Sequence, residues 1–328
     1  MAAQHEVPER YAETIETMEA AANGFAVEAG RGPSDKPRHL ALAEAIQGPV
    51  LIVSWSSAFV AGVIGTKAGT PLLLCFLRFA CAALLLTALA FALRSKWPKG
   101  KTLAHTVFAG VFMHAVQFCG FYYGMAHGLG GGVSALIQGL SSMIVVVLAA
   151  LTLGERLAKA QWLGFVIGIV GVVVAIEDRL AFSPVAVASA FLGLAGISVG
   201  TYWQKRFVSG VDVVSGTAVQ LAASAPLGLA ATLLFEHPQV TDSTRFAGAV
   251  AWIVLVNSLG VFLLLNHMLR TLPASSVSTL FLAVPATTSL LSWVFAGQTM
   301  SAQAVAGLVI GGIGAALAAW GATRRTKA

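Results

Sequence analysis

Inside the long apolar stretches of this sequence, the side chains able to do chemistry are neutral or basic, and no Asp or Glu lies deep in any stretch. The acidic residues of this region, such as Glu155, fall at the ends of the stretches or between them. A permanent cation buried at low dielectric needs a carboxylate partner, so we predict that lipophilic cations are not the main ligand. The three cysteines show no metal-binding spacing, and the sequence therefore indicates no metal site and no cofactor.

Arg78 lies about one third of the way along the second apolar stretch. A charged group at that depth is costly unless it is paired or solvated. One interpretation is a cation in a cavity, where it would bind a ligand carboxylate. The other is a helix-end arginine that snorkels or bonds to backbone carbonyls of the first stretch.

His114, Gln117 and Phe121 are spaced at i, i+3 and i+7 in the third stretch, on one face of a helix. An internal repeat, described below, places Asn257 at the position equivalent to His114. We predict that His114 and Asn257 form a polar pair in a cavity, where the imidazole can take a proton in a coupling step. An ordinary hydrogen bond between helices remains the alternative.

The other polar and aromatic candidates for the cavity are spread over four stretches: Trp55, Ser56, Gln138, Ser142, Tyr202 and Gln220. Small hydroxyl groups between membrane helices serve close packing more often than ligand binding, and both interpretations stay open. Pro285 interrupts the helix ladder of the ninth stretch and frees a carbonyl, so it is a hinge candidate. Glu155 precedes the fifth stretch, where a carboxylate caps N–H groups, and we predict a structural cap without a catalytic role.

Helices that cross a membrane must position these side chains. The 328 residues are 57% hydrophobic and 10% charged, whereas a soluble domain carries roughly 25% charged residues. Each apolar run approaches the roughly 20 residues that cross a ~30 Å hydrocarbon layer, and the alternating pattern of a barrel strand is absent. We predict an all-α membrane protein with ten transmembrane helices, at about 47–66, 71–93, 103–125, 129–152, 160–177, 183–203, 213–235, 247–269, 273–296 and 302–321.

The distribution of charge predicts the orientation. Residues 1–46 are rich in charge and offer no apolar face, so we expect a cytoplasmic, largely disordered tail, with a second cytoplasmic tail at 322–328. Fifteen Lys and Arg residues fall in segments on the side of the N-terminus, and three fall in the opposite loops. This bias predicts a bacterial-type inner (plasma) membrane protein with both termini in the cytoplasm. The net charge of +6 belongs to the membrane part and gives no indication of nucleic-acid binding.

The two halves of the chain repeat each other. Residues 128–174 align without a gap with residues 271–317, at an offset of 143. The alignment matches three glycines in each half: Gly164, Gly168 and Gly171 with Gly307, Gly311 and Gly314. Five spans per half is an odd number, so the second copy must enter the membrane upside down. We predict two inverted five-helix repeats, 47–177 and 183–321, around a central cavity, an organisation typical of transporters.

Several motifs carry a family resemblance over about residues 48–320. They are the turn Leu153-Gly154-Glu155-Arg156-Leu157 with Trp162-Leu163-Gly164, the first-span Trp55-Ser56-Ser57-Ala58-Phe59, and Arg78. Together they resemble the EamA-type branch of the drug/metabolite transporter superfamily. The resemblance implies ten helices around a central cavity and substrates such as amino acids, sugars or nucleosides, usually exported. The chain departs from the family pattern at Ser142, where the family has a proline, and Gln298 stands in the second-repeat turn where the first has Glu155.

We therefore predict a secondary active or facilitative transporter that exports small metabolites, with amino-acid-like compounds favoured, by alternating access. No nucleotide-binding loop is present, so no ATPase subunit is implied. The expected partners are a small-molecule substrate, the lipid bilayer and, if transport is coupled, protons. Two alternatives stay open: a membrane-embedded enzyme on lipid or prenyl substrates, which needs clustered Asp, His or Cys, and a non-transporting membrane subunit.

Overall fold

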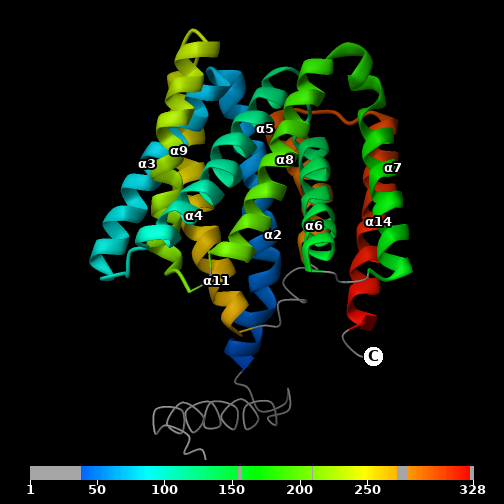
Figure 1. The fold of residues 1–328 in the computed structure, drawn as a ribbon. Coiled ribbons are helices and arrows are strands. Elements are labelled where there is room, and N and C mark those ends of the chain that lie inside the picture. Colours follow the sequence, from blue (N-terminus) through cyan, green and yellow to red (C-terminus); the bar gives the residue numbers. More distant parts are fainter. Residues whose placement is uncertain (1–37, 154–156, 209, 272–279, 326–328) are drawn as a thin grey trace, which may run out of the picture. The chain divides into compact units, whose positions relative to one another are not determined.

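The structure is a computed structural model that describes residues 38–153, 157–208, 210–271 and 280–325. Residues 48–328 form one compact unit. In the described residues the regular structure is helical, apart from an isolated β-bridge between Gly69 and Val240. The elements (Figure 1) are α2 (Arg38–Ala68), α3 (Pro71–Ala92), α4 (Gly100–Gly110), η2 (Val111–Val116), α5 (Gln117–Ala126), α6 (Gly131–Leu153), α7 (Lys159–Phe182), α8 (Pro184–Phe207), α9 (Val213–Phe235), α10 (Ser243–Trp252), η3 (Ile253–Val261), α11 (Phe262–Thr271), η4 (Phe281–Ala283), α13 (Val284–Ala296) and α14 (Ala302–Arg325).

The apolar helices confirm the predicted membrane fold. Within the described ranges, nine helical segments are long and apolar enough to cross a membrane, and Phe281–Ala296 is a shorter apolar helix. Two of the nine are composite: α4, η2 and α5 form the span Gly100–Ala126, and α10, η3 and part of α11 form the span Ser243–Leu265. The predicted span 273–296 begins outside the described residues, which resume at Leu280.

Turn and capping residues set where the helices begin. Pro71 and Pro184 stand in the first turns of α3 and α8, where a missing N–H costs no intrahelical bond. Asp212 and Asp242 cap α9 and α10 by accepting hydrogen bonds from backbone N–H groups of the first turn. Gly297 ends α13 in the left-handed conformation, with φ of 63°, which glycine adopts without steric cost. These short connections hold successive spans close together.

A local irregularity recurs in both halves. η2 and η3 are π-helical stretches inside the third and eighth spans. The offset of 143 carries Val111 to Val254 and Val116 to Leu259, so all of η2 maps inside η3. π-helical turns are rare and occur frequently at functional sites. The repeat seen in the sequence therefore extends to a detail of backbone geometry.

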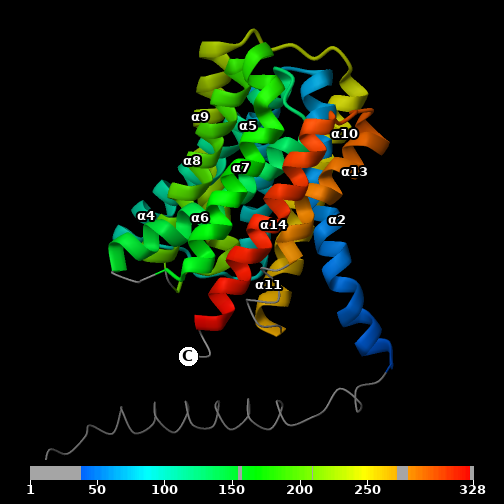
Figure 2. The same cartoon turned by 90° about the vertical axis from the view of Figure 1, so that its right-hand side faces the viewer.

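The contact between α7 and α14 shows that the two halves are inverted. These helices lie side by side (Figures 1 and 2). A Cβ atom added to Gly164 would lie 2.6 Å from the carbonyl oxygen of Gly314, and one added to Gly307 would lie 2.5 Å from that of Gly171. Gly307 is the repeat equivalent of Gly164, and Gly314 of Gly171, so this is one contact made twice. Such a self-complementary contact is the signature of a two-fold axis.

Other equivalent spans also pair across the halves. α3 packs against α9, the second span of one half against the second span of the other. α6 packs against α13, which are the two fourth spans. The halves therefore interlock around the same axis and do not form two separate bundles. Residues of both halves consequently face the space at the centre.

The glycine contact predicts an asymmetric response to added methyl groups. We expect Gly171→Ala to destabilise the protein by about 1–3 kcal/mol, because its Cβ would lie 2.6 Å from the Cα of Gly311 and the two backbones must separate. Gly312→Ala is the matched control, since a Cβ there meets nothing within 4 Å. Thermal unfolding of the detergent-purified variants measures both, and equal melting temperatures would contradict the contact.

Candidate functional site

A central cavity of about 340 Å³ lies between the two halves. Its walls come from α2, α3 and the third, fourth, sixth, seventh and eighth spans. This volume falls within the range of small-molecule sites, roughly 300–1,000 Å³. Of the side chains predicted to face a cavity, the following line it: Trp55, Arg78, His114, Gln117, Phe121, Gln138, Gln220 and Asn257.

Arg78 is a buried cation on the cavity wall. Its side chain is 6% exposed, and Nη1 donates a hydrogen bond of 2.6 Å to the hydroxyl of Tyr122. The guanidinium carbon lies 3.6 Å from the centre of the Phe118 ring, a cation–π contact. Nε has no hydrogen-bond partner, and no ion pair joins Arg78 to a carboxylate among the described residues. The arginine therefore faces the cavity and does not snorkel to a membrane surface.

The wall around Arg78 is largely apolar and aromatic. Phe121 is almost fully buried, and Trp55 packs edge-on against Phe281 with ring centres 4.7 Å apart. Of the groups that line the cavity, Arg78, His114, Tyr122 and Asp212 have ionisable side chains. In the part of the chain that the structure describes, no cluster of three or more His, Cys, Asp or Glu side chains is placed to hold a metal ion.

His114 begins a chain of hydrogen bonds along the wall. Its Nε2–H donates to Oε1 of Gln220 at 3.4 Å, and Nε2 of Gln220 donates to Oε1 of Gln204 at 2.6 Å. Nδ1 of His114 is buried and has no partner. The imidazole also stacks on Phe118, the ring that carries the Arg78 guanidinium on its face. His114 is thus held in place at one nitrogen only.

The predicted partner of His114 has a different bond. Asn257 lines the same cavity, but its Nδ2 donates to the carbonyl oxygen of Ser54 at 2.5 Å, and its Oδ1 is buried without a partner. No direct bond joins His114 to Asn257. Gln117 instead donates to Gln138 at 2.9 Å, which links the third and fourth spans. His114 and Asn257 are thus equivalent in position, each on a π-helical turn, but they have different hydrogen-bond partners.

Three predicted residues lie away from the cavity. Ser56 is fully buried, and its hydroxyl donates to the carbonyl oxygen of Val284 at 3.3 Å, so it joins α2 to α13. Ser142 is exposed on α6. One four-residue step from Gln138 turns an α-helix by only about 40°, yet Gln138 lines the cavity and Ser142 does not. Tyr202 is half-buried on α8, whereas Gln204, about 200° further round the helix, is the residue that lines the cavity.

The hinge and cap candidates fall at helix boundaries. Pro285 stands in the first turn of α13, directly after the 3₁₀ segment η4, so the α-helical ladder is interrupted there. Its role as a hinge stays a prediction. Glu155, the predicted structural cap, lies outside the described residues.

The cavity also contains residues that the spacing patterns did not single out. Phe118 follows His114 by four residues, and this helical spacing could have found it. Gln204 and Asp212 lie near the adjoining ends of α8 and α9, where polar residues are usually assigned to the membrane surface. Only the packing of these helix ends around the cavity distinguishes them from surface residues.

Lining residues of the cavity lie near both ends of the unit, with Asp212 and Leu265 at one end and Met125 at the other, where hydrogen bonds also join the elements. Asp212 and Leu265 lie at ends of their spans and line the cavity. At the opposite end, the carbonyl oxygen of Ala68 accepts from the N–H groups of Thr241 and Asp242, at 2.8 and 3.1 Å. Arg78 lies seven residues beyond the start of α3 at this tied end, which is about 10 Å along a helix.

Glu236 adds to the tied end. Its carboxylate accepts hydrogen bonds of 3.0 and 3.2 Å from the N–H of Leu72 and so caps α3 from the end of α9. Partial burial raises the pKa of this carboxyl above its ordinary value, against the opposing effect of the hydrogen bonds it accepts. Glu236 thus joins the second spans of the two halves at this end.

A multi-pass α-helical protein with two inverted repeats around a central cavity has the architecture of a secondary membrane transporter. The family comparison agrees, because the model of the EamA-like transporter family matches residues 45–176 and 185–320. The chain belongs to this family. It is therefore a multi-pass membrane protein of a transporter family, whose substrates are small molecules.

Individual relatives are more distant. A protein of Escherichia coli (strain K12) named "Probable amino-acid metabolite efflux pump" is 31% identical over 163 residues, 49% of this chain and 52% of that protein. A protein of the same name from Salmonella typhimurium is 27% identical over 273 residues, 80% of this chain and 89% of that one. The "Uncharacterized inner membrane transporter YedA" of E. coli (strain K12) is 21% identical over 252 residues, 76% of this chain and 82% of that protein.

The fold itself recurs in an experimental structure. One crystal structure, at 22% sequence identity, superposes with a TM-score of 0.59 and covers 86% of this chain and 98% of the other. At this identity the likeness concerns the fold alone.

Asp212 predicts a measurable pH dependence of stability. Burial raises the pKa of its carboxyl, but the hydrogen bonds from Ser215, Ser95 and Val214 outweigh burial and hold it below its ordinary value. The stabilisation is therefore present above about pH 4 and is lost as the pH falls through the lowered pKa. We expect Asp212→Ala to cost about 1 kcal/mol at pH 7 by loss of the α9 cap.

Asp212→Asn is the control for this prediction, because its amide oxygen can still accept the capping bonds but cannot titrate. The stability difference between the native protein and Asp212→Asn should shrink when thermal unfolding is measured below about pH 4. A difference that is constant with pH would show that the carboxylate charge has no part in the cap.

Proposed function

We propose that the protein exports small metabolites that carry a carboxylate beside an apolar group, with amino-acid-like compounds favoured, by alternating access. Arg78 carries this proposal. It is a buried cation that lines the cavity, with an unpaired Nε and no ion pair among the described residues. An uncompensated charge at such a depth is costly, and a bound carboxylate would supply the missing countercharge.

The rest of the cavity fits the remainder of such a substrate. The aromatic rings of Trp55, Phe118 and Phe121 offer apolar surface next to the guanidinium. The amide groups of Gln117 and Gln220 can accept hydrogen bonds from a substrate ammonium group without adding a negative charge. The names of the E. coli and Salmonella relatives, probable amino-acid metabolite efflux pumps, support the same class.

The direction of transport follows from the orientation. The Lys and Arg distribution favours an inner-membrane protein with both termini in the cytoplasm. In that orientation, the end that carries Asp212 faces the cytoplasm and the end tied at Ala68 faces outward. The cavity would then take up its substrate from inside the cell. Exchange of the contacts at the two ends, which inverted repeats make possible, would release the substrate on the other side.

The role of Arg78 is tested by transport into proteoliposomes of radiolabelled leucine, phenylalanine, adenosine and glucose. We expect flux of a carboxylate-bearing compound with the native protein and at least a tenfold loss of kcat/KM with Arg78→Gln. Arg78→Lys should keep part of the flux at a higher KM, because lysine keeps the charge but loses the planar guanidinium. Arg94→Gln, at an exposed arginine just after α3, is the matched control.

An unchanged carboxylate flux in Arg78→Gln would overturn the proposal, as would flux of adenosine or glucose alone. The thermal unfolding midpoint of each variant separates loss of binding from loss of folding. A folded Arg78→Gln protein without flux supports a binding role.

We also propose that His114 couples transport to protons. Its Nδ1 is free of hydrogen bonds, and the Phe118 ring contacts both the imidazole and the Arg78 guanidinium. The guanidinium of Arg78 places a positive charge near His114 in the empty cavity. A carboxylate bound at Arg78 would offset that charge, so the loaded cavity would take up a proton more readily.

His114→Gln tests the coupling. Glutamine keeps a hydrogen bond to Gln220 but cannot take a proton, so we expect the pH dependence of the flux seen with the native protein to be lost in this variant. The native protein should drive uphill transport under an imposed pH gradient, and His114→Gln should only equilibrate the substrate. Uphill transport by His114→Gln would exclude His114 as the coupling group.

A further inference from the structure

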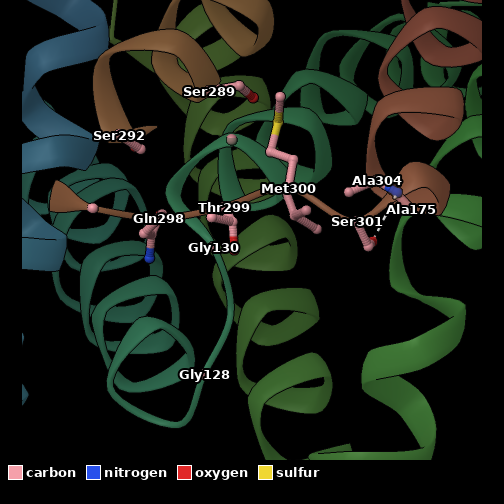
Figure 3. A pocket seen from close by; sticks show the side chains of 13 residues that line it. Gly128, Gly130, Ala175, Ser289, Ser292, Gln298, Thr299, Met300, Ser301 and Ala304 are labelled. Carbon is pink, nitrogen blue, oxygen red and sulfur yellow. Dashed lines mark hydrogen bonds between the residues drawn. The ribbon is translucent and has the colours of Figure 1, made fainter. Parts of the chain in front are cut away.

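A second cavity, of about 260 Å³, lies at the end of the unit where the α5–α6 and α13–α14 connections meet. It shares no lining residue with the central cavity. Figure 3 shows the segment from Gln298 to Ser301 running across it, with Ser289 and Ser292 of α13 on one side and Gly130 before α6. None of its thirteen lining residues has an ionisable side chain. Its polarity therefore comes from hydroxyl groups, one amide and the backbone.

Two helix N-termini point their positive ends at this cavity. α6 begins at Gly131 and α14 begins at Ala302, and residues of both first turns line the wall. The first N–H groups of a helix have no partner within the helix, and the helix dipole adds roughly half a positive charge at each N-terminus. Two such ends at one small cavity favour an anion.

Capping bonds use some of the N–H groups at the starts of α6 and α14 and leave the others free. Oε1 of Gln298 accepts from the N–H of Gly131 at 2.9 Å, and Oγ of Ser301 accepts from the N–H of Ala304 at 3.2 Å. Each bond satisfies one N–H of its helix. In the last turns of α13, the carbonyl oxygen of Ser292 accepts from the N–H of Gln298 at 3.1 Å. The remaining first-turn N–H groups of α6 and α14 are therefore available to a ligand.

Ser292 supplies independent evidence for a ligand. Its side chain is 2% exposed and lines the cavity, yet its hydroxyl has no hydrogen-bond partner. A buried hydroxyl without a partner is costly and calls for an explanation, of which an absent ligand is one. Gly131 makes room for the Ser292 hydroxyl, because a Cβ at position 131 would lie 2.7 Å from the Ser292 Oγ. An anion in the cavity would accept the unused hydroxyl proton.

We infer that this cavity is a second binding site, for a small anion held by the N-termini of α6 and α14 and by the hydroxyl of Ser292. The ligand is either chloride from the medium or the carboxylate of the transported metabolite, and both are monovalent acceptors that match the donors present. The metabolite as source rests on the function proposed above. With both termini in the cytoplasm, the site lies on the outer side of the membrane. There it would bind the carboxylate of the substrate as the substrate leaves the protein.

The test is a titration of the purified full-length protein with sodium chloride and with sodium acetate, followed by thermal unfolding. Ser292→Ala removes the unpartnered hydroxyl at the cavity. Ser134→Ala is the matched control, because Ser134 is also a fully buried serine with an unpartnered hydroxyl but does not line the cavity. General effects of ionic strength on stability are the same in both variants, so they cancel when the two titrations are compared.

We expect acetate, chloride or both to raise the melting temperature of the native protein and of Ser134→Ala at the same anion concentration. Ser292→Ala should need about tenfold more anion, the effect of one lost hydrogen bond to a charged group. Its melting temperature without anion should not fall, because the hydroxyl that it loses has no partner. A response to acetate alone assigns the site to carboxylates, and a response to chloride assigns it to inorganic anions.

Equal titrations of Ser292→Ala and Ser134→Ala would overturn the inference, as would no response to either anion. Repeating the titration in an Arg78→Gln background removes the central cation as a competing site. If that variant does not fold, the comparison of the two serine variants still holds, since Arg78 is present in both. The outcome is independent of the transport measurements, so either proposal can fail alone.

Discussion

The close approach of α7 and α14 is the contact on which the rest of the fold depends. Between helices in a lipid bilayer the hydrophobic effect supplies little attraction, so association relies on backbones that come near one another. Gly164 and Gly171 allow this on one helix, and Gly307 and Gly314 on the other. Because the same surface meets itself, the second half must be turned over relative to the first. The pairing of the second spans and of the fourth spans follows the same axis and places residues of both halves around one cavity.

The two halves have a symmetric backbone, but their side chains at equivalent positions differ in charge. The offset that relates Gly164 to Gly307 carries Arg78 to Leu221, and both line the central cavity. One half therefore contributes a cation and the other an apolar side chain at equivalent places. His114 and Asn257 differ in the same way, since one can gain a proton and the other cannot. A symmetric scaffold with an asymmetric wall can orient a ligand that has one charged and one apolar end.

Apolar length, turn residues and the glycine pattern predicted the spans and the repeat, because these depend on local sequence. The cavity face of the third span was also predictable, since His114 begins a helical spacing that the fold preserves. Ser142 shows the limit of such patterns: a spacing identifies a face, but the neighbouring helices decide whether it meets a cavity or lipid. Gln204 and Asp212 were overlooked for a related reason, because polar residues at span ends also occur at the membrane surface. Phe118 resembled an ordinary core residue until Arg78 was seen to stack on it.

The π-helical turns η2 and η3 bear on the history of the chain. A π-helical turn holds one residue more than an α-helical turn, and helices rarely keep such an insertion without a use. Both copies carry it at equivalent positions, around His114 and around Asn257. A shared insertion is what is expected if it was present before the two halves were duplicated and joined. The two halves have the same widened turn but different side chains on it, a histidine in one and an asparagine in the other.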